Sequence, residues 1–276
     1  MSDSLAVAPF PMTSSSVFAS SDAMSMFRLR GLPDFQQGDD LAQSIIDTLA
    51  LNQQTLLEGD ILVIAHKVVS KTEGAYAFLD QITPSDDAIT LAKTVNKDPR
   101  KVEVILTQSK RIVRAVKRPE QQEGVLIAEH KNGYICANAA VDESNADHPG
   151  QLILLPDDPD KSARQLCLAL ESYFHCNLGV VISDTFGRPW RLGQTNVAIG
   201  LANVPGVMNM AGEVDAFGRP LSVTAPAFGD ELAAASGLLM EKSAKAPVIV
   251  FRGLDWPKTD SSSRDLIRAH NEDLFR

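Results

Sequence analysis

The chain has 276 residues, of which 44% are hydrophobic and 22% charged, and its formal net charge at pH 7 is −9. This composition is typical of a soluble globular protein, and the length allows one large domain or two modest ones. The negative charge argues against a nucleic-acid binder that works through bulk electrostatics. It leaves open a small anionic ligand bound by a few local cations.

The sequence predicts neither a membrane span nor a secretory signal. No apolar run approaches the roughly 20 residues that cross a bilayer, and the first 26 residues contain no Lys or Arg, so the basic start of a signal peptide is missing. The three cysteines form no C-x-x-C pattern and fit a reducing compartment. We therefore expect a cytoplasmic protein with no membrane or nucleic-acid partner.

Three regions are expected along the chain. The Ser-, Ala- and Met-rich residues 1–25 predict a disordered N-terminal tail. Residues 26–256 are expected to form one catalytic unit, and residues 257–276 a polar C-terminal tail.

The first predicted elements are a strand, a turn, a helix and a second strand. Residues 26–30 alternate apolar and basic side chains, which is typical of a strand. Gly31 and Pro33 predict a turn after it, and Asp39 or Asp40 is expected to cap an amphipathic helix. Residues 61–65 are an apolar, β-rich run that predicts a buried strand.

Residues 66–74, H-K-V-V-S-K-T-E-G, are interpreted as a loop at the end of that strand. Lysines are common at solvated strand ends, and that explanation alone accounts for the composition. The alternative is a phosphate-facing loop, because backbone N–H groups and ammonium groups would gather just past a strand terminus.

The middle of the chain predicts two helices over residues 85–108, broken near Pro99, and then three strands. The last strand leads into Asp142 and Asn145. Such residues usually form Asx turns. Beside a second strand end that carries an aspartate, they become candidate ligands for a hard cation. The three strands are expected over residues 110–116, 124–128 and 133–140.

The most informative stretch is residues 182–200, I-S-D-T-F-G-R-P-W-R-L-G-Q-T-N-V-A-I-G. An apolar strand is expected to deliver Asp184 and Thr185 to its end, and a second apolar run opens at Asn196. The glycines and the proline between them predict a loop. A carboxylate, a hydroxyl group, two guanidinium groups and an amide within this loop can hold a metal ion and an anion together.

The remaining elements complete the predicted fold. A strand and an amphipathic helix precede the stretch, and a turn, a helix from Gly229 and a last strand follow it. Because strands and helices are mixed without a regular βαβ period, we predict an α+β fold with mixed or antiparallel sheets and packed helices. The strand before the stretch is expected over residues 151–155. The helix is expected to begin within residues 156–160 and to have its apolar face between Ala163 and Phe174. The turn is expected over residues 215–221 and the last strand over residues 247–251.

Several common enzyme motifs are missing. The sequence contains no G-x-x-x-x-G-K-[ST], G-x-G-x-x-G, H-E-x-x-H or G-x-S-x-G, which disfavours a P-loop NTPase, a dinucleotide-binding fold, a zinc protease and a serine hydrolase of the nucleophile-elbow type. Paired aspartates, a hydroxyl group and an amide suit Mg²⁺ or Mn²⁺. Nearby lysines and arginines suit phosphoryl oxygens. The residues alone therefore indicate an enzyme that handles a metal and a phosphate.

The chain resembles the coenzyme F420-0:L-glutamate ligase family from Phe27 to Gly253. The resemblance is supported by D-A-F-G-R-P-L near Asp215 and D-E-L-A-A-A near Asp230. The motifs that carry it are G-L-P-D-F at 31–35, K-V-V-S-K-T-E-G at 67–74, A-N-A-A-V-D-E-S-N at 137–145 and S-D-T-F-G-R-P-W-R-L-G-Q-T-N-V-A-I-G at 183–200.

The resemblance implies a GTP-dependent amide ligase. In that family a substrate carboxylate is phosphorylated by GTP, and the amine of glutamate then displaces phosphate from the acyl phosphate. The implied fold is an α+β fold without a P-loop, assembled as a homodimer. The implied co-substrate and ions are GTP and two divalent cations, Mg²⁺ or Mn²⁺, with K⁺ as a further candidate.

The resemblance also implies roles for individual residues. Asp142 and Asp184 would share one divalent cation, and Thr185, with Gln194 nearby, would hold a second. Lys71 would contact the phosphates of the nucleotide. His66 stands beside the nucleotide, at a position that is often Ser in the family. The residues expected around the nucleotide are Leu32, Pro33, Asp34, Phe35, His66, Lys71 and Asn145.

Two arginines are added from their chemistry. Arg188 and Arg191 are predicted to clamp a phosphate or a carboxylate, because the planar guanidinium group suits both. A structural salt bridge is the equally weighted alternative. Asn209 stands where the family leads us to expect an acidic residue, which leaves part of the distal site open.

Two other functions stay open at this point. The chain could be a ligase of the same fold that acts on a different small carboxylate, and product analysis would separate this from the first hypothesis. It could also be a non-catalytic nucleotide-binding protein. The retention of both aspartates, Thr185 and Lys71 argues against the latter.

Overall fold

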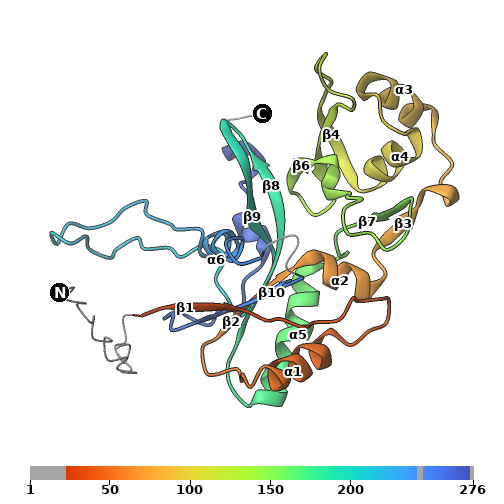
Figure 1. The fold of residues 1–276 in the computed structure, drawn as a ribbon. Helices are drawn as coiled ribbons and strands as arrows, with labels where there is room; N and C mark the ends of the chain where they lie inside the picture. Colours follow the sequence, from red (N-terminus) through yellow and green to blue (C-terminus); the bar gives the residue numbers. More distant parts are fainter. Residues whose placement is uncertain (1–22, 241–244, 274–276) are drawn as a thin grey trace, which may run out of the picture.

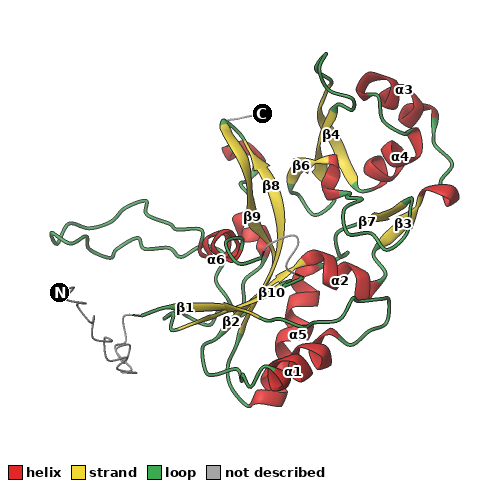
Figure 2. Cartoon of the chain, in the orientation of Figure 1, coloured by secondary structure: helices red, strands yellow, loops and turns green. Residues whose placement is uncertain are grey.

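The structure of the protein, a computed structural model, describes residues 23–240 and 245–273. A tail was predicted over residues 1–25, and its residues 1–22 lie outside the described residues. A larger part built on a five-stranded sheet and a smaller part built on a three-stranded sheet make up the described chain (Figures 1 and 2). The predicted α+β class is confirmed.

The five-stranded sheet is mixed. Strand β2 pairs with β8 in parallel, and the other neighbouring strands are antiparallel. The strands predicted over residues 26–30, 61–65 and 247–251 are confirmed within two residues at each end. In sheet order the strands are β1 (Ser25–Arg28), β10 (Val248–Arg252), β2 (Ile61–Ala65), β8 (Gly179–Arg188) and β9 (Arg191–Ala202).

Helices cover both faces of this sheet (Figure 1). Since successive side chains of a strand point to opposite faces, Leu62 and Ile64 join the core that contains residues of α1 (Leu41–Leu51) and α5 (Pro159–Phe174). Ile61 and Val63 join the core that contains Leu232 of α6 (Phe228–Ser236). The carboxylate of Asp40 accepts a hydrogen bond from the N–H of Gln43, so Asp40 caps α1 as one of the two predicted candidates.

The smaller part packs two helices on an antiparallel sheet. Ala88 and Val102 from the helices meet Leu126 from the sheet in a separate core. The hydroxyl group of Tyr134 donates a 2.5 Å hydrogen bond to the carbonyl of Ile199 and so joins this part to β9. The elements are β3 (Tyr76–Phe78), α3 (Asp86–Val95), α4 (Pro99–Thr107), β4 (Ser109–Val116), β5 (Val125–His130), β6 (Ile135–Ala137) and β7 (Gln151–Ile153), of which β3 pairs with β7.

The loop predicted over residues 66–74 is wrong, because this segment is the helix α2 (His66–Glu73). It begins directly after β2 and ends at Gly74, whose φ of 71° is the left-handed conformation common at helix C-termini. Residues four apart lie on the same face of a helix. The helix therefore places Lys67 beside Lys71, and His66 beside Ser70.

The loop predicted after Asp184 is also wrong. Strands β8 and β9 stay paired up to Arg188 and Arg191, so the stretch is one long hairpin. Inter-strand hydrogen bonds satisfy backbone groups that a loop would expose to water. The strand expected over residues 133–140 is shorter than predicted, since β6 ends at Ala137 and a turn with positive φ at residues 138–140 follows.

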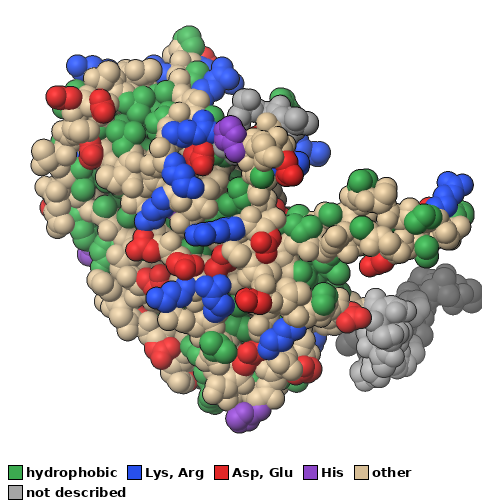
Figure 3. Space-filling model, turned by 180° about the vertical axis from the view of Figure 1, so that it is seen from behind, with side chains coloured by type: hydrophobic (Ala, Val, Ile, Leu, Met, Phe, Trp, Pro, Cys, Tyr) green, Lys and Arg blue, Asp and Glu red, His purple; other side chains and the backbone are tan. Residues whose placement is uncertain are grey.

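Residues 208–226 form an arm that extends away from the body (Figures 1 and 3). Its two sides are joined by hydrogen bonds from Met208 N–H to Pro226 O and from Met210 N–H to Thr224 O. The turn predicted over residues 215–221 is its tip. None of the helices in the described part of the chain has the length and hydropathy of a membrane span.

Candidate active site

A cavity of about 960 Å³ opens where the two parts of the molecule meet. Segments that are far apart in sequence line it: the turn after β1, the start of α2, the loop after β6, and the facing stretches of β8 and β9. Most residues predicted from the sequence come together here. They are Leu32, Pro33, Asp34, Phe35, His66, Lys71, Asp142, Asn145, Asp184, Thr185 and Gln194.

The parallel pairing of β2 with β8 explains why His66 lies beside Asp184. Ala65 is opposite Ser183 in the register, so β2 ends beside Ser183, while β8 continues to Arg188. Ligand sites in open α/β sheets commonly lie outside the carboxyl ends of the strands. The residues that follow this pair, His66 at the start of α2 and Asp184 in β8, therefore both reach the cavity.

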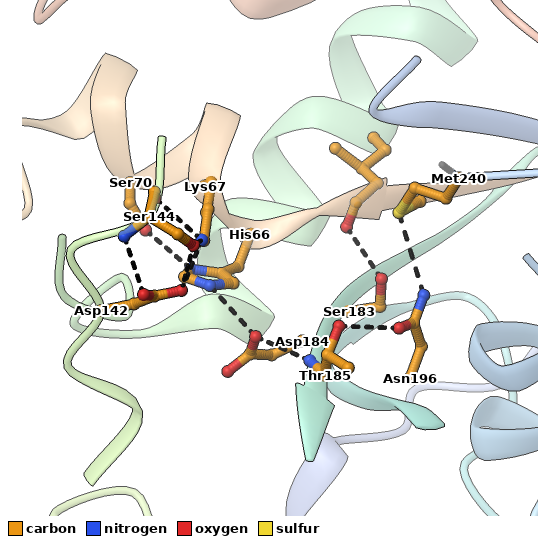
Figure 4. Close-up of polar contacts among 11 residues, drawn as sticks. His66, Lys67, Ser70, Asp142, Ser144, Ser183, Asp184, Thr185, Asn196 and Met240 are labelled. Atoms are coloured by element: carbon orange, nitrogen blue, oxygen red, sulfur yellow. Dashed lines mark hydrogen bonds and ion pairs between the residues drawn. The ribbon is translucent and has the colours of Figure 1, made fainter. Parts of the chain in front are cut away.

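The Asp184 carboxylate is held by two donors (Figure 4). Its Oδ1 accepts a 2.7 Å hydrogen bond from the N–H of Thr185 and lies 3.2 Å from Nε2 of His66. Nδ1 of His66 lies 3.2 Å from the hydroxyl group of Ser70. Both His66 and Ser70 are buried. This chain of contacts fixes the direction of the carboxylate at the edge of the cavity.

The Asp142 carboxylate lies against a lysine from α2 (Figure 4). Nζ of Lys67 donates a 2.5 Å hydrogen bond to Oδ2 of Asp142, and the N–H of Ser144 donates to Oδ1 at 2.8 Å. Burial raises the pKa of Asp142, but the hydrogen bonds from Lys67 and Ser144 and the charge of Lys67 outweigh it, so the pKa falls to about 2. Asp142 is thus a carboxylate at neutral pH.

The second lysine of α2 lies close to the same loop. Nζ of Lys71 donates a 2.6 Å hydrogen bond to Asp147. Two ammonium groups on one face of α2 and two aspartates on the facing loop give this wall both signs of charge. An anionic ligand that enters the cavity would meet Lys67 and Lys71 together.

Thr185 faces Asn196 across the hairpin. Its hydroxyl group donates a 2.9 Å hydrogen bond to Oδ1 of Asn196, since the two residues are opposite each other in the β8–β9 register. A hydroxyl oxygen that donates its proton keeps its lone pairs for a cation or another donor. Gln194 is near the same end of the cavity.

Residues 32–35, which were predicted to line the nucleotide, differ in how far their side chains are exposed. The side chains of Leu32 and Phe35 belong to the core, whereas Asp34 is exposed and accepts a 2.9 Å hydrogen bond from Nζ of Lys245. This hydrogen bond lowers the pKa of Asp34. The turn therefore offers one carboxylate and its backbone to the cavity.

Arg188 and Arg191 are not among the residues that line the cavity. They lie opposite each other at the hairpin tip, and both are exposed. Trp190 and Leu192 are exposed there as well, by 80% and 98%. The structure thus separates the two arginines from the other predicted residues, and their role as a clamp stays a prediction.

Sequence reasoning missed several residues of the cavity. Lys67 was predicted to lie with Lys71 in the candidate phosphate-facing segment, but it was given no role of its own. Its spacing of four from Lys71 would have paired the two lysines, had the helix been predicted. Asn196 could have been found from the pairing of β8 with β9. No local signal marks Asp147 or Lys245, which lies 211 residues from Asp34 in sequence.

The oxygen atoms that line the cavity suit a cation that is bound by the protein and by a substrate together. Among the described residues no group of three or more His, Cys, Asp or Glu side chains is arranged to hold a metal ion. Asp142, Asp184 and Thr185 nevertheless line one cavity and supply hard oxygens. Mg²⁺ is usually held by one or two carboxylates, with water and substrate phosphates as the other ligands. Two aspartates beside two lysines suit that pattern.

The fold and the cavity together define an α+β protein without a P-loop, whose site combines two aspartates with two lysines. A family model described as F420-0:Gamma-glutamyl ligase matches residues 31–253. The chain belongs to this family of ligases.

Curated relatives are similar in sequence to this chain over most of their length. The chain is similar to the protein named coenzyme F420:L-glutamate ligase from Methanopyrus kandleri, with 45% identity over 87% of this chain and 92% of the relative. It is 39% identical to the protein of the same name from Methanothermobacter thermautotrophicus, over 92% of this chain and 99% of the relative. The protein of that name from Methanocaldococcus jannaschii is 40% identical, over 89% and 94% of the two chains.

Proposed function

We propose that the protein adds L-glutamate to coenzyme F420-0 in a reaction that consumes GTP and requires a divalent cation. The observation that carries the proposal is the convergence of Asp142, Asp184, Lys67 and Lys71 on one cavity. Carboxylates and ammonium groups in that arrangement suit a nucleoside triphosphate and its cation. The names of the curated relatives support the choice of F420 and glutamate as substrates.

The proposed reaction has two steps. An oxygen of the F420-0 carboxylate attacks the γ-phosphorus of GTP, the bond to the β-phosphate oxygen breaks, and GDP leaves. The amine of glutamate then attacks the carbonyl carbon of the acyl phosphate, inorganic phosphate leaves, and the nitrogen loses a proton. No strong general base is needed, because an amine is already a capable nucleophile toward an acyl phosphate.

The residues of the cavity take separate roles in this proposal. Lys67 and Lys71 bind phosphoryl oxygens and stabilise the charge that develops on them. Asp142 and Asp184 would hold one divalent cation, and Thr185, with Gln194 nearby, would hold a second. Such cations would offset the negative charge of the phosphates and of the leaving group. The turn at residues 32–35 and Asn145 hold the rest of the nucleotide.

The most direct test is an assay with F420-0, L-glutamate, GTP and Mn²⁺, read by mass spectrometry of the deazaflavin product. We expect F420 with added glutamate, and release of GDP and phosphate in equal amounts. Glutamate addition to a different acid, but not to F420-0, would support a ligase with another acceptor. An absence of any GTP turnover with a full set of acceptors would refute the ligase function.

We also propose that the protein is a homodimer. The hairpin tip and the arm each expose large apolar side chains to solvent, and exposed apolar surface beyond scattered single residues commonly marks an interface. Light scattering in solution tests this assembly. A cytoplasmic location and a requirement for K⁺ stay predictions. The exposed apolar residues in question are Trp190, Leu192, Val214, Phe217 and Val223.

A further inference from the structure

The two oxygens of the Asp184 carboxylate have different surroundings. Oδ1 accepts the hydrogen bond from the N–H of Thr185 at 2.7 Å and faces Nε2 of His66 at 3.2 Å. Among the described residues, no side chain or backbone group contacts Oδ2 within hydrogen-bond distance. One oxygen is therefore engaged by the protein, and the other is left for a ligand in the cavity.

The His66 ring is held in place from both sides. Its side chain is 3% exposed, and the ring reaches Asp184 with Nε2 and Ser70 with Nδ1 (Figure 4). Ser70 lies one turn further along α2 and is fully buried. A carboxylate only accepts hydrogen bonds, so Nε2 carries the proton toward Asp184, and in the neutral ring Nδ1 accepts from the hydroxyl group of Ser70. The contact with Ser70 thus favours the tautomer that serves Asp184.

We propose that His66 is a positioning residue that makes Asp184 a monodentate ligand. By engaging Oδ1 together with the Thr185 amide, His66 leaves only Oδ2 for a divalent cation. This inference rests on the proposed function, in which Asp184 holds such a cation.

The consequence concerns which cation the site accepts. Mg²⁺ requires near-octahedral geometry with short bonds, whereas Ca²⁺ tolerates bidentate carboxylates and a higher coordination number. A carboxylate that offers one oxygen suits the smaller cations, Mg²⁺ and Mn²⁺. A carboxylate with both oxygens free can chelate Ca²⁺. His66 therefore contributes to the preference for the smaller cations.

A purely structural role for His66 makes a different prediction. A buried imidazole needs hydrogen-bond partners for both nitrogens, and Ser70 and Asp184 supply them. If this were the whole role, replacing His66 would change the stability of the fold. The affinity for Mn²⁺ and the discrimination against Ca²⁺ would then stay the same in every folded variant.

Two amide substitutions separate these roles. In His66→Gln the side-chain nitrogen can reach the position of Nε2 and keep the contact with Asp184. In His66→Asn the shorter side chain reaches only the position of Nδ1, beside Ser70. Both variants replace the ring by a neutral amide, so they differ mainly in whether Oδ1 of Asp184 is held. His175→Gln, at the end of α5, is the control for a histidine outside the cavity.

The measurement is the binding of Mn²⁺ to the full-length chain, followed by the electron paramagnetic resonance signal of free Mn²⁺, with Ca²⁺ as competitor. Outer-shell partners of metal ligands are typically worth about 10- to 100-fold in affinity. We expect the Mn²⁺ affinity of His66→Asn to fall by a factor in that range. We also expect lower Ca²⁺ concentrations to displace Mn²⁺ from this variant. The Mn²⁺ affinities of His66→Gln and His175→Gln should stay close to that of the unsubstituted protein.

Each outcome decides the inference. If His66→Asn binds Mn²⁺ with unchanged affinity and unchanged discrimination against Ca²⁺, the positioning role is overturned, while the proposed ligase function stands. If the unchanged chain binds no Mn²⁺, with or without GTP, the cation part of the proposed function fails together with this inference. If His66→Asn does not fold, Ser70→Ala replaces it, and that variant is expected to weaken Mn²⁺ binding in the same direction because the ring loses its second contact.

Discussion

Lys67 and Asp142 form a 2.5 Å ion pair that connects helix α2 to the loop after β6, across 75 residues of sequence. The pair places an ammonium group and a carboxylate side by side at the wall of the cavity. In the proposed reaction each serves a different ligand, since the lysine binds phosphoryl oxygens and the aspartate binds a cation.

Replacing Lys67 by Met should weaken the binding of GTP. The variant removes one charge-assisted hydrogen bond, worth about 1.5–3 kcal/mol, so the KM for GTP should rise about 10- to 100-fold. Steady-state kinetics with varied GTP concentration measures this change. Lys97→Met is the matched control, because Lys97 forms a comparable 2.7 Å ion pair with Glu123 outside the cavity. An unchanged KM in the Lys67 variant would count against its phosphate role.

Asp184→Asn should abolish turnover while leaving the fold intact. Asparagine keeps an oxygen that can accept the hydrogen bonds from Thr185 and His66, but it lacks the charge that holds a cation. A loss of several kcal/mol of transition-state stabilisation lowers the rate by roughly 100-fold or more. Rates of glutamate addition, together with the melting temperature, test this outcome. Asp157→Asn removes an exposed aspartate elsewhere, and its activity should not change.

GTP should be preferred over ATP, and Asp34 should contribute to the preference. A carboxylate accepts hydrogen bonds from the N1–H and the exocyclic amine of guanine, whereas N1 of adenine is itself an acceptor. We expect Asp34→Ala to reduce the ratio of kcat/KM for GTP over ATP by about 10-fold, because the variant removes an acceptor that only guanine can use. Equal use of the two nucleotides by the unchanged chain would contradict the nucleotide assignment.

Acid should destabilise the fold through His130. Burial lowers the pKa of His130 to about 4, and the charges of Lys131 and Lys110 act in the same direction, while Asp184 and Asp157 act against it. A group whose pKa is lower in the folded state than in the unfolded state contributes stability above the unfolded value, here 6.5, and loses that contribution as the pH falls toward 4. The expected loss by pH 4 is about 3 kcal/mol, since one pKa unit corresponds to about 1.4 kcal/mol.

Urea unfolding at several pH values between 7 and 4 measures this dependence. His130→Leu should make the free energy of unfolding less dependent on pH in this window. A slope in His130→Leu that equals the slope of the unsubstituted protein would show that another group is responsible.

The sequence predicted the apolar strands, the cap of α1 and the break near Pro99 well, because those signals are local. Asp40 caps α1, and the break near Pro99 separates α3 from α4. The helix α2 was missed because the lysines that follow β2 were interpreted as a strand end. The hairpin was missed because glycines and a proline favour a loop locally, whereas the pairing of β8 with β9 depends on partners across the sheet.

The composition of the cavity was predictable in part, and its connections were not. The motifs around Asp142 and Asp184 identified candidate ligands from the sequence alone. Which lysine faces which aspartate depends on the helical spacing in α2 and on the position of the loop after β6. The contact between Asp34 and Lys245 could not be predicted, because the two residues lie at opposite ends of the chain.

The order of strands in the large sheet has a consequence for synthesis of the chain. Strand β10, the last in sequence, lies between β1 and β2, and β2 leads directly into His66 and α2. Domains fold as the growing chain leaves the ribosome, but here β1 has no partner among the described strands, and one edge of β2 stays unpaired, until the residues of β10 have emerged. A truncation before residue 248 would therefore remove the strand that joins β1 to β2, the strand that leads to His66 at the cavity.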